Sequence, residues 1–547
     1  MQSAGTILKG RFYSLAREGE RFAALRVGPD GRIAETYAAG APLPAGLPVR
    51  DLLAEGPREG RRPVAMVPAF IDSHVHFLPK AAMGALARPL ARLEGGRLLP
   101  DCLEGVGALL KEEAEAKPRG PVIGYGLFAG ALAERRLPSA AELDTWVPGR
   151  PVLVFSLDGH SSAYSSAALR LLKLESLAVE GRLSGEAHEF NMGRVMAYAM
   201  RGLGPAALAR GIAGAVGEAA AAGLASLHCL EGFDDAKSDP GVAALALVAP
   251  RLPLRLKLWL QYTEPRKVER YARLLGNRRA GGCLAWEMDG SVSSRSAAFD
   301  RPYRDRGGSG SLYRSAEEAY ALARPFFEAG YQLSAHAIGP RGIESILSAY
   351  ERLLEGTGED AGGRRLRIDH FEFPRPDQVG RAGRLRLVLP VQPGFAWLDE
   401  RVLHSYPEAL DEEAARSFCP LKSLKEAGAV LALSTDAPVQ PFDPFVQVAG
   451  AVQHPNPAER LSVHEALRAY SWAGAYAAFE EGDRGTLEPG KYADFAVLDA
   501  DPFGTPDDKL SEIRALGTWH EGRPLAAPPG GLAGFALAAL GAGRRRL

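Results

Sequence analysis

The chain has 547 residues, of which 46% are hydrophobic, and its formal net charge is −1 at pH 7. A chain of this length exceeds one ordinary hydrophobic core, so two or three domains are expected. The balanced charge gives no electrostatic basis for binding nucleic acid. The four cysteines lack the spacing of a disulfide framework or of a cysteine–zinc site.

The ends of the chain carry no signal for secretion or membrane insertion. Residues 1–5 lack the basic and apolar regions of a signal peptide. The longest apolar stretch, 530–543, is too short and too rich in glycine and alanine to span a bilayer. We therefore expect a cytoplasmic protein without a membrane partner, in which 526–547 is a C-terminal tail forming a packed or frayed helix.

Short strand patterns punctuated by turns occur near both ends of the chain. At the N-terminal side, two of them flank the turn Gly-Pro-Asp-Gly at 28–31, and at the C-terminal side they lie at 493–499 and 515–519. Neither segment has enough strands to bury a core alone. We expect residues 1–62 and 480–525 to pair into one small composite β-sandwich domain.

Between these segments, eight apolar runs that look like strands alternate with helical patterns. Near-continuous apolar strands joined by helices are typical of parallel strands buried on both faces, and eight such strands close a (β/α)8 barrel. The predicted fold is therefore an α/β protein with a TIM-type barrel over 63–479, and segment 81–222 is inserted between the first two strands. The eight runs are 67–75, 224–230, 254–260, 282–289, 331–337, 366–371, 385–391 and 430–435.

Histidines and one aspartate stand at the ends of four of these runs. His74 and His76 end the first strand and, two residues apart, point to the same side. His336 and His370 end the fifth and sixth strands, and Asp436 ends the eighth. Barrel enzymes carry their chemistry at this end of the strands, and nitrogen and oxygen donors suit a divalent ion, zinc first. Such an ion activates water, and the aspartate would move its proton.

These residues lie in motifs that resemble those of the metal-dependent amidohydrolase superfamily, and within it the amidohydrolase-3, YtcJ-like family. Pro68–Phe77 resembles the motif PGFIDSHVHF, with Ala69 in place of glycine. The resemblance runs from about residue 23 to 522 and implies the barrel, a terminal β-domain and hydrolase activity. Further segments resemble other motifs of the family: GHS at 159–161, DGS…RTA at 289–297, HAIGD at 336–339, RIEH at 367–370, SDAPV at 434–439 and GSLEPGKxAD at 485–494.

Three more residues are expected to bind substrate, His160 on the strength of the resemblance. His160 in the insertion would line the pocket, as would Asp289 after the fourth strand. Arg295 could bind a substrate carboxylate through two parallel hydrogen bonds. From the sequence alone, a structural role for His160 and a surface salt bridge for Arg295 remain equally compatible.

The fourth strand departs from the family pattern. The family's lysine, which can be carboxylated to bridge two metals, falls here on Ala285. In one interpretation Glu287, on the same strand face, replaces it and two ions bind. We favour the other interpretation, in which one ion binds and His370 steers water or substrate. That single ion would be held by His74, His76, His336 and Asp436.

The predicted function is metal-dependent hydrolysis of a C–N bond other than a peptide bond, as in an N-acyl, formamide or cyclic amide substrate. One alternative is a mononuclear deaminase acting on an amino-heterocycle. Another alternative is a catalytically silent barrel that binds a small molecule. Two departures from the family pattern support it, the missing lysine and Pro340, which stands in place of the family's aspartate. The expected partner is a small-molecule substrate, and the expected assembly, if any, is a homodimer.

Overall fold

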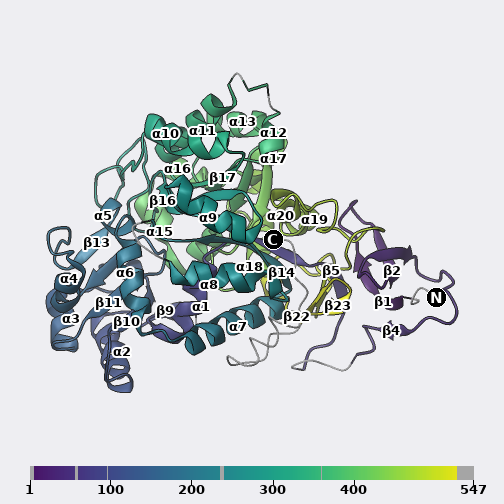
Figure 1. Ribbon diagram of the computed structural model, residues 1–547, viewed down its shortest axis with the longest axis horizontal. Coiled ribbons are helices and arrows are strands. Elements are labelled where there is room, and N and C mark those ends of the chain that lie inside the picture. Colours follow the sequence, from purple (N-terminus) through teal and green to yellow (C-terminus); the bar gives the residue numbers. More distant parts are fainter. Residues whose placement is uncertain are drawn as a thin grey trace.

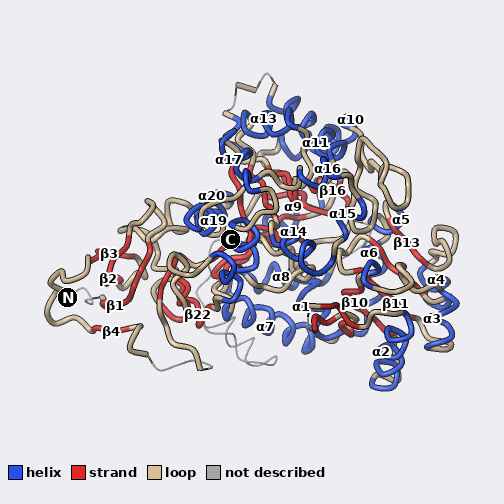
Figure 2. The backbone as a smooth tube through the Cα atoms, turned by 180° about the vertical axis from the view of Figure 1, so that it is seen from behind, coloured by secondary structure: helices blue, strands red, loops and turns tan. Residues whose placement is uncertain are grey.

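The computed structural model describes residues 5–55, 60–94, 96–234, 239–355, 357–358 and 360–525. A sheet built from both ends of the chain lies at one end of the molecule, a barrel lies in the middle, and an inserted unit lies at the other end (Figure 1). Figure 2 shows the same three parts from behind. The predicted tail, 526–547, falls outside the described residues.

Each of the eight predicted barrel runs contains a strand of one parallel sheet, in the order β20-β19-β18-β17-β16-β15-β14-β6. The edge strands β6 and β20 are joined through an isolated parallel bridge between Val75 and Ala437, so the sheet nearly closes. The TIM-type barrel is therefore confirmed. Its strands are β6 (Phe70–Val75), β14 (Leu224–Glu231), β15 (Arg255–Leu260), β16 (Arg279–Glu287), β17 (Gln332–Ala337), β18 (Arg367–His370), β19 (Val388–Val391) and β20 (Val430–Leu433).

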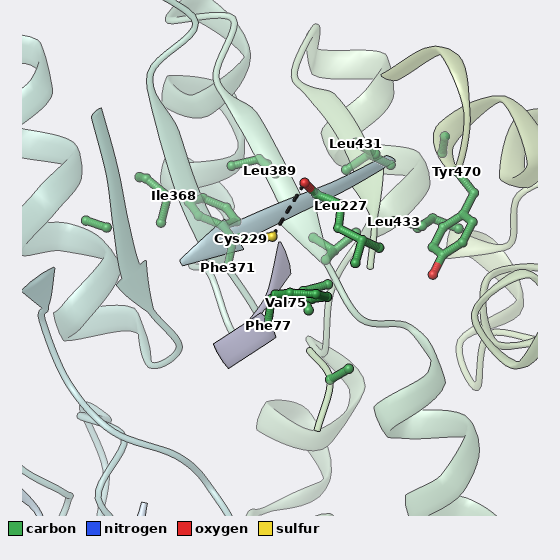
Figure 3. Packing of buried hydrophobic residues seen from close by; sticks show 14 of the residues in the cluster. Val75, Phe77, Leu227, Cys229, Ile368, Phe371, Leu389, Leu431, Leu433 and Tyr470 are labelled. Carbon is green, nitrogen blue, oxygen red and sulfur yellow. Dashed lines mark hydrogen bonds between the residues drawn. The ribbon is translucent and has the colours of Figure 1, made fainter. Parts of the chain in front are cut away.

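Side chains alternate between two environments along these strands. Leu227 and Cys229 of β14 belong to the large apolar core, where Phe77 at the start of α1 also packs (Figure 3). His228, between them, instead contacts Trp259 of β15 and Arg367 of β18. The helices thus cover an apolar outer face, and the barrel interior carries polar groups.

Local sequence signals account for the helices around the barrel. Ser315 and Glu318 form a capping box at the start of α10. Pro340 begins α11, a position where the missing N–H costs little, and its carbonyl accepts a hydrogen bond from Gln378 Nε2 at 2.8 Å. The longer barrel helices are α1 (Phe77–Leu86), α7 (Pro205–Ala221), α8 (Pro240–Val248), α9 (Pro265–Leu275), α10 (Ala316–Glu328), α11 (Pro340–Leu354), α13 (Pro376–Arg384), α17 (Leu421–Ala427) and α18 (Pro444–Val452).

Strands from both ends of the chain form one eight-stranded sheet, in the order β23-β22-β21-β5-β1-β2-β3, with β4 paired to β1. The sheet curves back on itself, because Arg32 beside β3 forms a bridge with Tyr492 ahead of β21. The strands are β1 (Thr6–Tyr13), β2 (Arg21–Val27), β3 (Ile33–Tyr37), β4 (Val49–Asp51), β5 (Ala65–Pro68), β21 (Phe495–Leu498), β22 (Ala515–His520) and β23 (Arg523–Pro524).

The predicted first barrel strand, 67–75, is wrong at its start. Pro68 ends β5, which pairs with β1 and β21 in the terminal sheet, whereas Phe70 begins β6 in the barrel. The apolar run continues through Ala69 because both sheets bury it. One apolar segment therefore serves two sheets.

The insertion forms its own α/β unit beside the barrel. Its sheet has the order β13-β12-β11-β10-β7, and β8 and β9 form a separate hairpin. Two apolar runs of the insertion, 122–128 and 152–157, contain β10 and β11. Among the described residues no helix is long and apolar enough to cross a membrane. The elements are β7 (Arg88–Pro89), β8 (Arg92–Glu94), β9 (Arg97–Leu99), α2 (Leu103–Ala116), β10 (Val122–Leu127), α3 (Ala140–Trp146), β11 (Val152–Ser156), β12 (Ser161–Tyr164), α4 (Ser166–Leu172), β13 (Arg182–Ser184), α5 (Glu186–Glu189) and α6 (Met192–Ala199).

Candidate active site

The five predicted metal donors at the strand ends lie close together at one mouth of the barrel. His74 Nε2 and His76 Nε2 lie 3.3 and 3.4 Å from Asp436 Oδ1. The ring centroid of His370 is 4.7 Å from that of His74 and 4.4 Å from that of His336. Four strands that are far apart in sequence thus bring these side chains into one cluster.

Neighbouring side chains orient two of these imidazoles. His74 Nδ1 lies 3.0 Å from Asp369 Oδ2, and His370 Nδ1 lies 2.9 Å from Gln392 Oε1, which leaves each Nε2 for the cluster. Burial raises the pKa of Asp369, but the charges of Arg367 and His74 outweigh it and lower that pKa to about 2. An ionised Asp369 carboxylate therefore lies beside Nδ1 of His74 and fixes the orientation of the ring.

Two carboxylate oxygens in the cluster are buried and have no hydrogen-bond partner, Asp436 Oδ1 and Glu287 Oε2. The imidazole contacts to Asp436 lack hydrogen-bond geometry. Burial raises the pKa of Asp436, but His74 and His76 outweigh this and hold it well below its usual value. A buried carboxylate oxygen that lies among imidazoles without a hydrogen bond is costly without a cation, so the donor set fits a divalent metal.

Strand β16 carries a bulge where the family has its lysine. Gly282 pairs with Ala335, but the next paired residue is Glu287, opposite His336, so four residues lie outside the ladder. Cys283 lies within this bulge, with Sγ 3.7 Å from the Nε2 atom of His74. This cysteine was not predicted from the sequence, because its partners come from other strands and no spacing between cysteines reveals them.

The insertion contributes His160 to the same cluster. His160 Nδ1 lies 2.9 Å from Glu189 Oε1 and 4.0 Å from Glu287 Oε2, and its ring centroid is 5.2 Å from that of His336. Desolvation lowers the pKa of His160, but these carboxylates outweigh it and raise that pKa well above its usual value. Glu189, in the short helix α5, was not predicted, since no motif marks it.

The other two predicted substrate-binding residues contact parts of the protein in the structure. Asp289 accepts hydrogen bonds from the backbone N–H groups of Ala298, Ile338 and Gly339 at 2.8, 2.9 and 2.8 Å. Arg295 forms an ion pair with Asp305, at 2.7 Å between Nη2 and Oδ2. These contacts favour positioning roles for both side chains.

Two cavities of unequal size meet at the cluster. Their volumes are about 350 and 70 Å³, and His160, His370 and Asp436 line both. The larger lies between barrel and insertion, and its apolar lining includes Met83, Leu93, Leu98, Phe155, Met192 and Met196. The smaller is bounded by Phe128, Val292, Ile338 and Phe395.

The parallel barrel, with imidazoles and a carboxylate at its strand ends, defines the class of barrel enzymes that work at that mouth. Residues 64–526 match the model of the amidohydrolase family. The chain therefore belongs to the amidohydrolase family, and the resemblance found in its motifs is confirmed.

Similar proteins support this assignment over most of the chain. The putative amidohydrolase YtcJ of Bacillus subtilis (strain 168) is 24% identical over 472 residues, covering 81% of this chain and 86% of that protein. The N-substituted formamide deformylase of Arthrobacter pascens is 26% identical over 498 residues, covering 84% and 87%. The crystal structure of an uncharacterized metal-dependent hydrolase from Pyrococcus furiosus has a TM-score of 0.65 at 24% identity, covering 91% of this chain and 99% of that one. This last likeness supports the fold.

Proposed function

We propose that this protein is a metal-dependent hydrolase that cuts a non-peptide C–N bond in a small N-acyl, formamide or cyclic amide substrate. The observation that carries the proposal is the cluster of four strand-end histidines around Asp436, whose Oδ1 is buried without a hydrogen-bond partner. The similarity to an N-substituted formamide deformylase supports this bond class. Cytoplasmic location and a homodimer remain part of the proposal.

The cluster assigns a role to each strand-end residue. His74, His76, His336 and Asp436 would hold a divalent ion, zinc first. When bound, such an ion lowers the pKa of water and polarises a carbonyl oxygen. Asp436 accepts the proton of the attacking water and returns it to the leaving nitrogen, and His370 orients the water or the substrate.

The surroundings of the cluster suggest how the substrate lies. The unequal cavities favour an amide with one small and one large apolar substituent, which meet where both cavities reach His160. The positive charge of His160 stabilises the negative charge that develops on the carbonyl oxygen. Asp289 and Arg295 support the loops around the site.

A substrate panel tests the proposal. Protein reconstituted with zinc or manganese is incubated with N-substituted formamides, N-acyl amides, cyclic amides and amino-heterocycles, and released amine and ammonia are measured. We expect release of amine, or ring opening, in the amide classes. Ammonia from amino-heterocycles alone would overturn the proposal in favour of a deaminase. Metal-independent binding without turnover would identify a silent barrel.

A further inference from the structure

Cys283 lies at the centre of the donor cluster and has no other evident function there. The residue is 4% exposed, and its Sγ lies 3.7 Å from His74 Nε2 and 3.9 Å from His336 Nδ1. A thiol makes only weak hydrogen bonds, so these contacts explain little of why it stands among ring nitrogens. Its position between two imidazoles is that of a ligand.

Among the described residues, Cys283 Sγ belongs to two groups of three possible donors whose ligand atoms lie within 4.8 Å of one another. One group is His74, Cys283 and His370, and the second is Cys283, Glu287 and His336. His74 also forms such a group with His76 and Asp436, so the thiol lies between that group and the second one.

The second group also contains a buried oxygen without a hydrogen-bond partner. Glu287 is 1% exposed, its Oε1 accepts a hydrogen bond from the N–H of Leu284 at 2.7 Å, and its Oε2 has no hydrogen-bond partner. A buried carboxylate oxygen without a hydrogen bond, whose contact to His160 Nδ1 is as long as 4.0 Å, costs free energy that a cation would offset. The missing hydrogen bond at Glu287 Oε2 therefore indicates an ion independently of the cysteine.

The backbone of β16 places the thiol where it is. Gly281 and Gly282 have φ angles of +99° and +131°, which side chains disfavour. A Cβ on Gly281 would lie 1.9 Å from the carbonyl oxygen of Ser334. The two glycines thus allow close approach to β17 and start the bulge that carries Cys283.

We propose that Cys283, Glu287 and His336 form a second metal position and that the Cys283 thiolate bridges the two ions. The thiolate would thereby replace the family's bridging lysine, whose position is Ala285 in this chain. The proposal rests on the proposed metal-dependent function and extends it from the single ion favoured above to two. With two ions, His74, His76 and Asp436 hold the first, and His336 is a ligand of the second. As the sulfur–metal bond forms, the S–H bond breaks and its proton passes to solvent, so no oxidant or reductant is needed. Thiolate, imidazole and carboxylate together favour zinc over magnesium or calcium.

Cobalt(II) binding tests the proposal without an activity assay. A thiolate bound to cobalt(II) gives an intense near-ultraviolet charge-transfer band that imidazole and carboxylate ligands do not give. Metal-stripped protein titrated with cobalt(II) should bind two ions per chain and show this band. Cys283→Ala and Cys283→Ser should lose the band and bind one ion.

Cys229→Ala is the matched control. Cys229 is equally buried in a barrel strand, but it lies in the apolar core and donates to the Leu227 carbonyl at 3.7 Å (Figure 3). This variant should keep both the band and two ions. Thermal unfolding of each variant verifies that it is folded.

The outcomes separate this proposal from the proposed function. One ion without the band in the unmodified protein would overturn the role of Cys283 and leave a single-metal hydrolase standing. A band that persists in Cys283→Ala would also overturn it. Failure to bind any ion would contradict both the second position and metal-dependent hydrolysis.

Discussion

Asp436 and His370 occupy backbone conformations that non-glycine residues rarely adopt, with φ angles of +58° and +74°. Each costs about 1–3 kcal/mol and persists only where surrounding contacts hold it. The N–H of Asp436 donates to the carbonyl of His74 at 3.0 Å, at the seam between the first and eighth strands. The seam that closes the barrel therefore also sets the carboxylate against the histidines.

Asp436→Asn should abolish turnover while leaving most of the metal bound. The amide keeps an oxygen donor but cannot accept the proton of water, so the expected loss in kcat is about 10²–10⁴-fold. Steady-state hydrolysis and metal analysis of the same sample check this prediction. Activity close to that of the unmodified protein would refute the role of Asp436 in proton transfer.

Residues at strand ends could be predicted from the chain alone, because each follows an apolar run and barrel chemistry gathers there. His74, His370 and Asp436 were predicted in this way. Cys283 was not, because it lies inside a strand at a bulge, and Glu189 was not, because it lies in the insertion. Both become visible only when separate strands and helices are packed together.

The bulge in β16 is an element whose geometry controls the site. Gly281→Ala would set a Cβ against the Ser334 carbonyl and impose a left-handed φ on alanine. We expect the free energy of unfolding to fall by about 2 kcal/mol or more and metal affinity to weaken. Urea unfolding and metal titration measure the two effects.

Gly214→Ala provides the control for that prediction. Gly214 is exposed in α7, and a Cβ there meets nothing within 4 Å. Alanine is a better helix former than glycine, so stability should stay the same or rise by up to about 1 kcal/mol. Equal changes in the free energy of unfolding for Gly281→Ala and Gly214→Ala would contradict the structural role of the bulge.

The barrel strands were predictable as elements because near-continuous apolar runs have few alternatives to burial on both faces. The continuous apolar character of the first run also made the boundary at Ala69 unpredictable, because the run passes there from β5 in one sheet to β6 in another. Burial alone cannot assign a strand to a sheet. The pairing partners that decide it, such as β21, lie hundreds of residues away.

At the scale of the molecule, an ion cluster joins the barrel to the C-terminal segment. Glu480 accepts a hydrogen bond from Lys257 Nζ at 2.8 Å and forms an ion pair with Arg255, both on β15. Glu480→Gln would remove the carboxylate that two largely buried cations share and should lower the free energy of unfolding by about 3 kcal/mol. Glu481→Gln, at a more exposed pair with Arg365, should cost at most about 1 kcal/mol.

The same carboxylate predicts a pH dependence. Burial raises the pKa of Glu480, but Lys257 and Arg255 outweigh it and lower the pKa from 4.5 to about 2. Its stabilisation is therefore fully present above pH 4.5 and is lost as the pH falls towards 2. The difference in stability between the unmodified protein and Glu480→Gln should shrink over that range. A difference that stays constant in acid would refute this assignment.

The larger cavity lies where two parts of the molecule meet, so the insertion should control substrate size and polarity. Leu93, on the hairpin β8–β9, is 56% exposed and lines this cavity. Leu93→Ser should lower kcat/KM for substrates with a large apolar substituent by about fivefold, corresponding to about 1 kcal/mol of lost apolar contact. Small substrates should be unaffected.

Leu177→Ser controls for a general effect of placing serine on the insertion. Leu177 is 43% exposed and is not among the residues that line the cavity. It should leave kcat/KM unchanged for both substrate sizes. A loss that is the same for large and small substrates would argue against the cavity as the binding site.

Metal dependence is the central claim, and it is tested most directly by measuring metal content and amide hydrolysis in one sample purified without chelators or an affinity-metal column. We predict that the chain retains a zinc-like ion, that chelation removes the ion and the hydrolysis together, and that added zinc restores both. Hydrolysis that survives complete removal of metal, or a chain that binds no divalent ion even after incubation with zinc or manganese, would contradict the account.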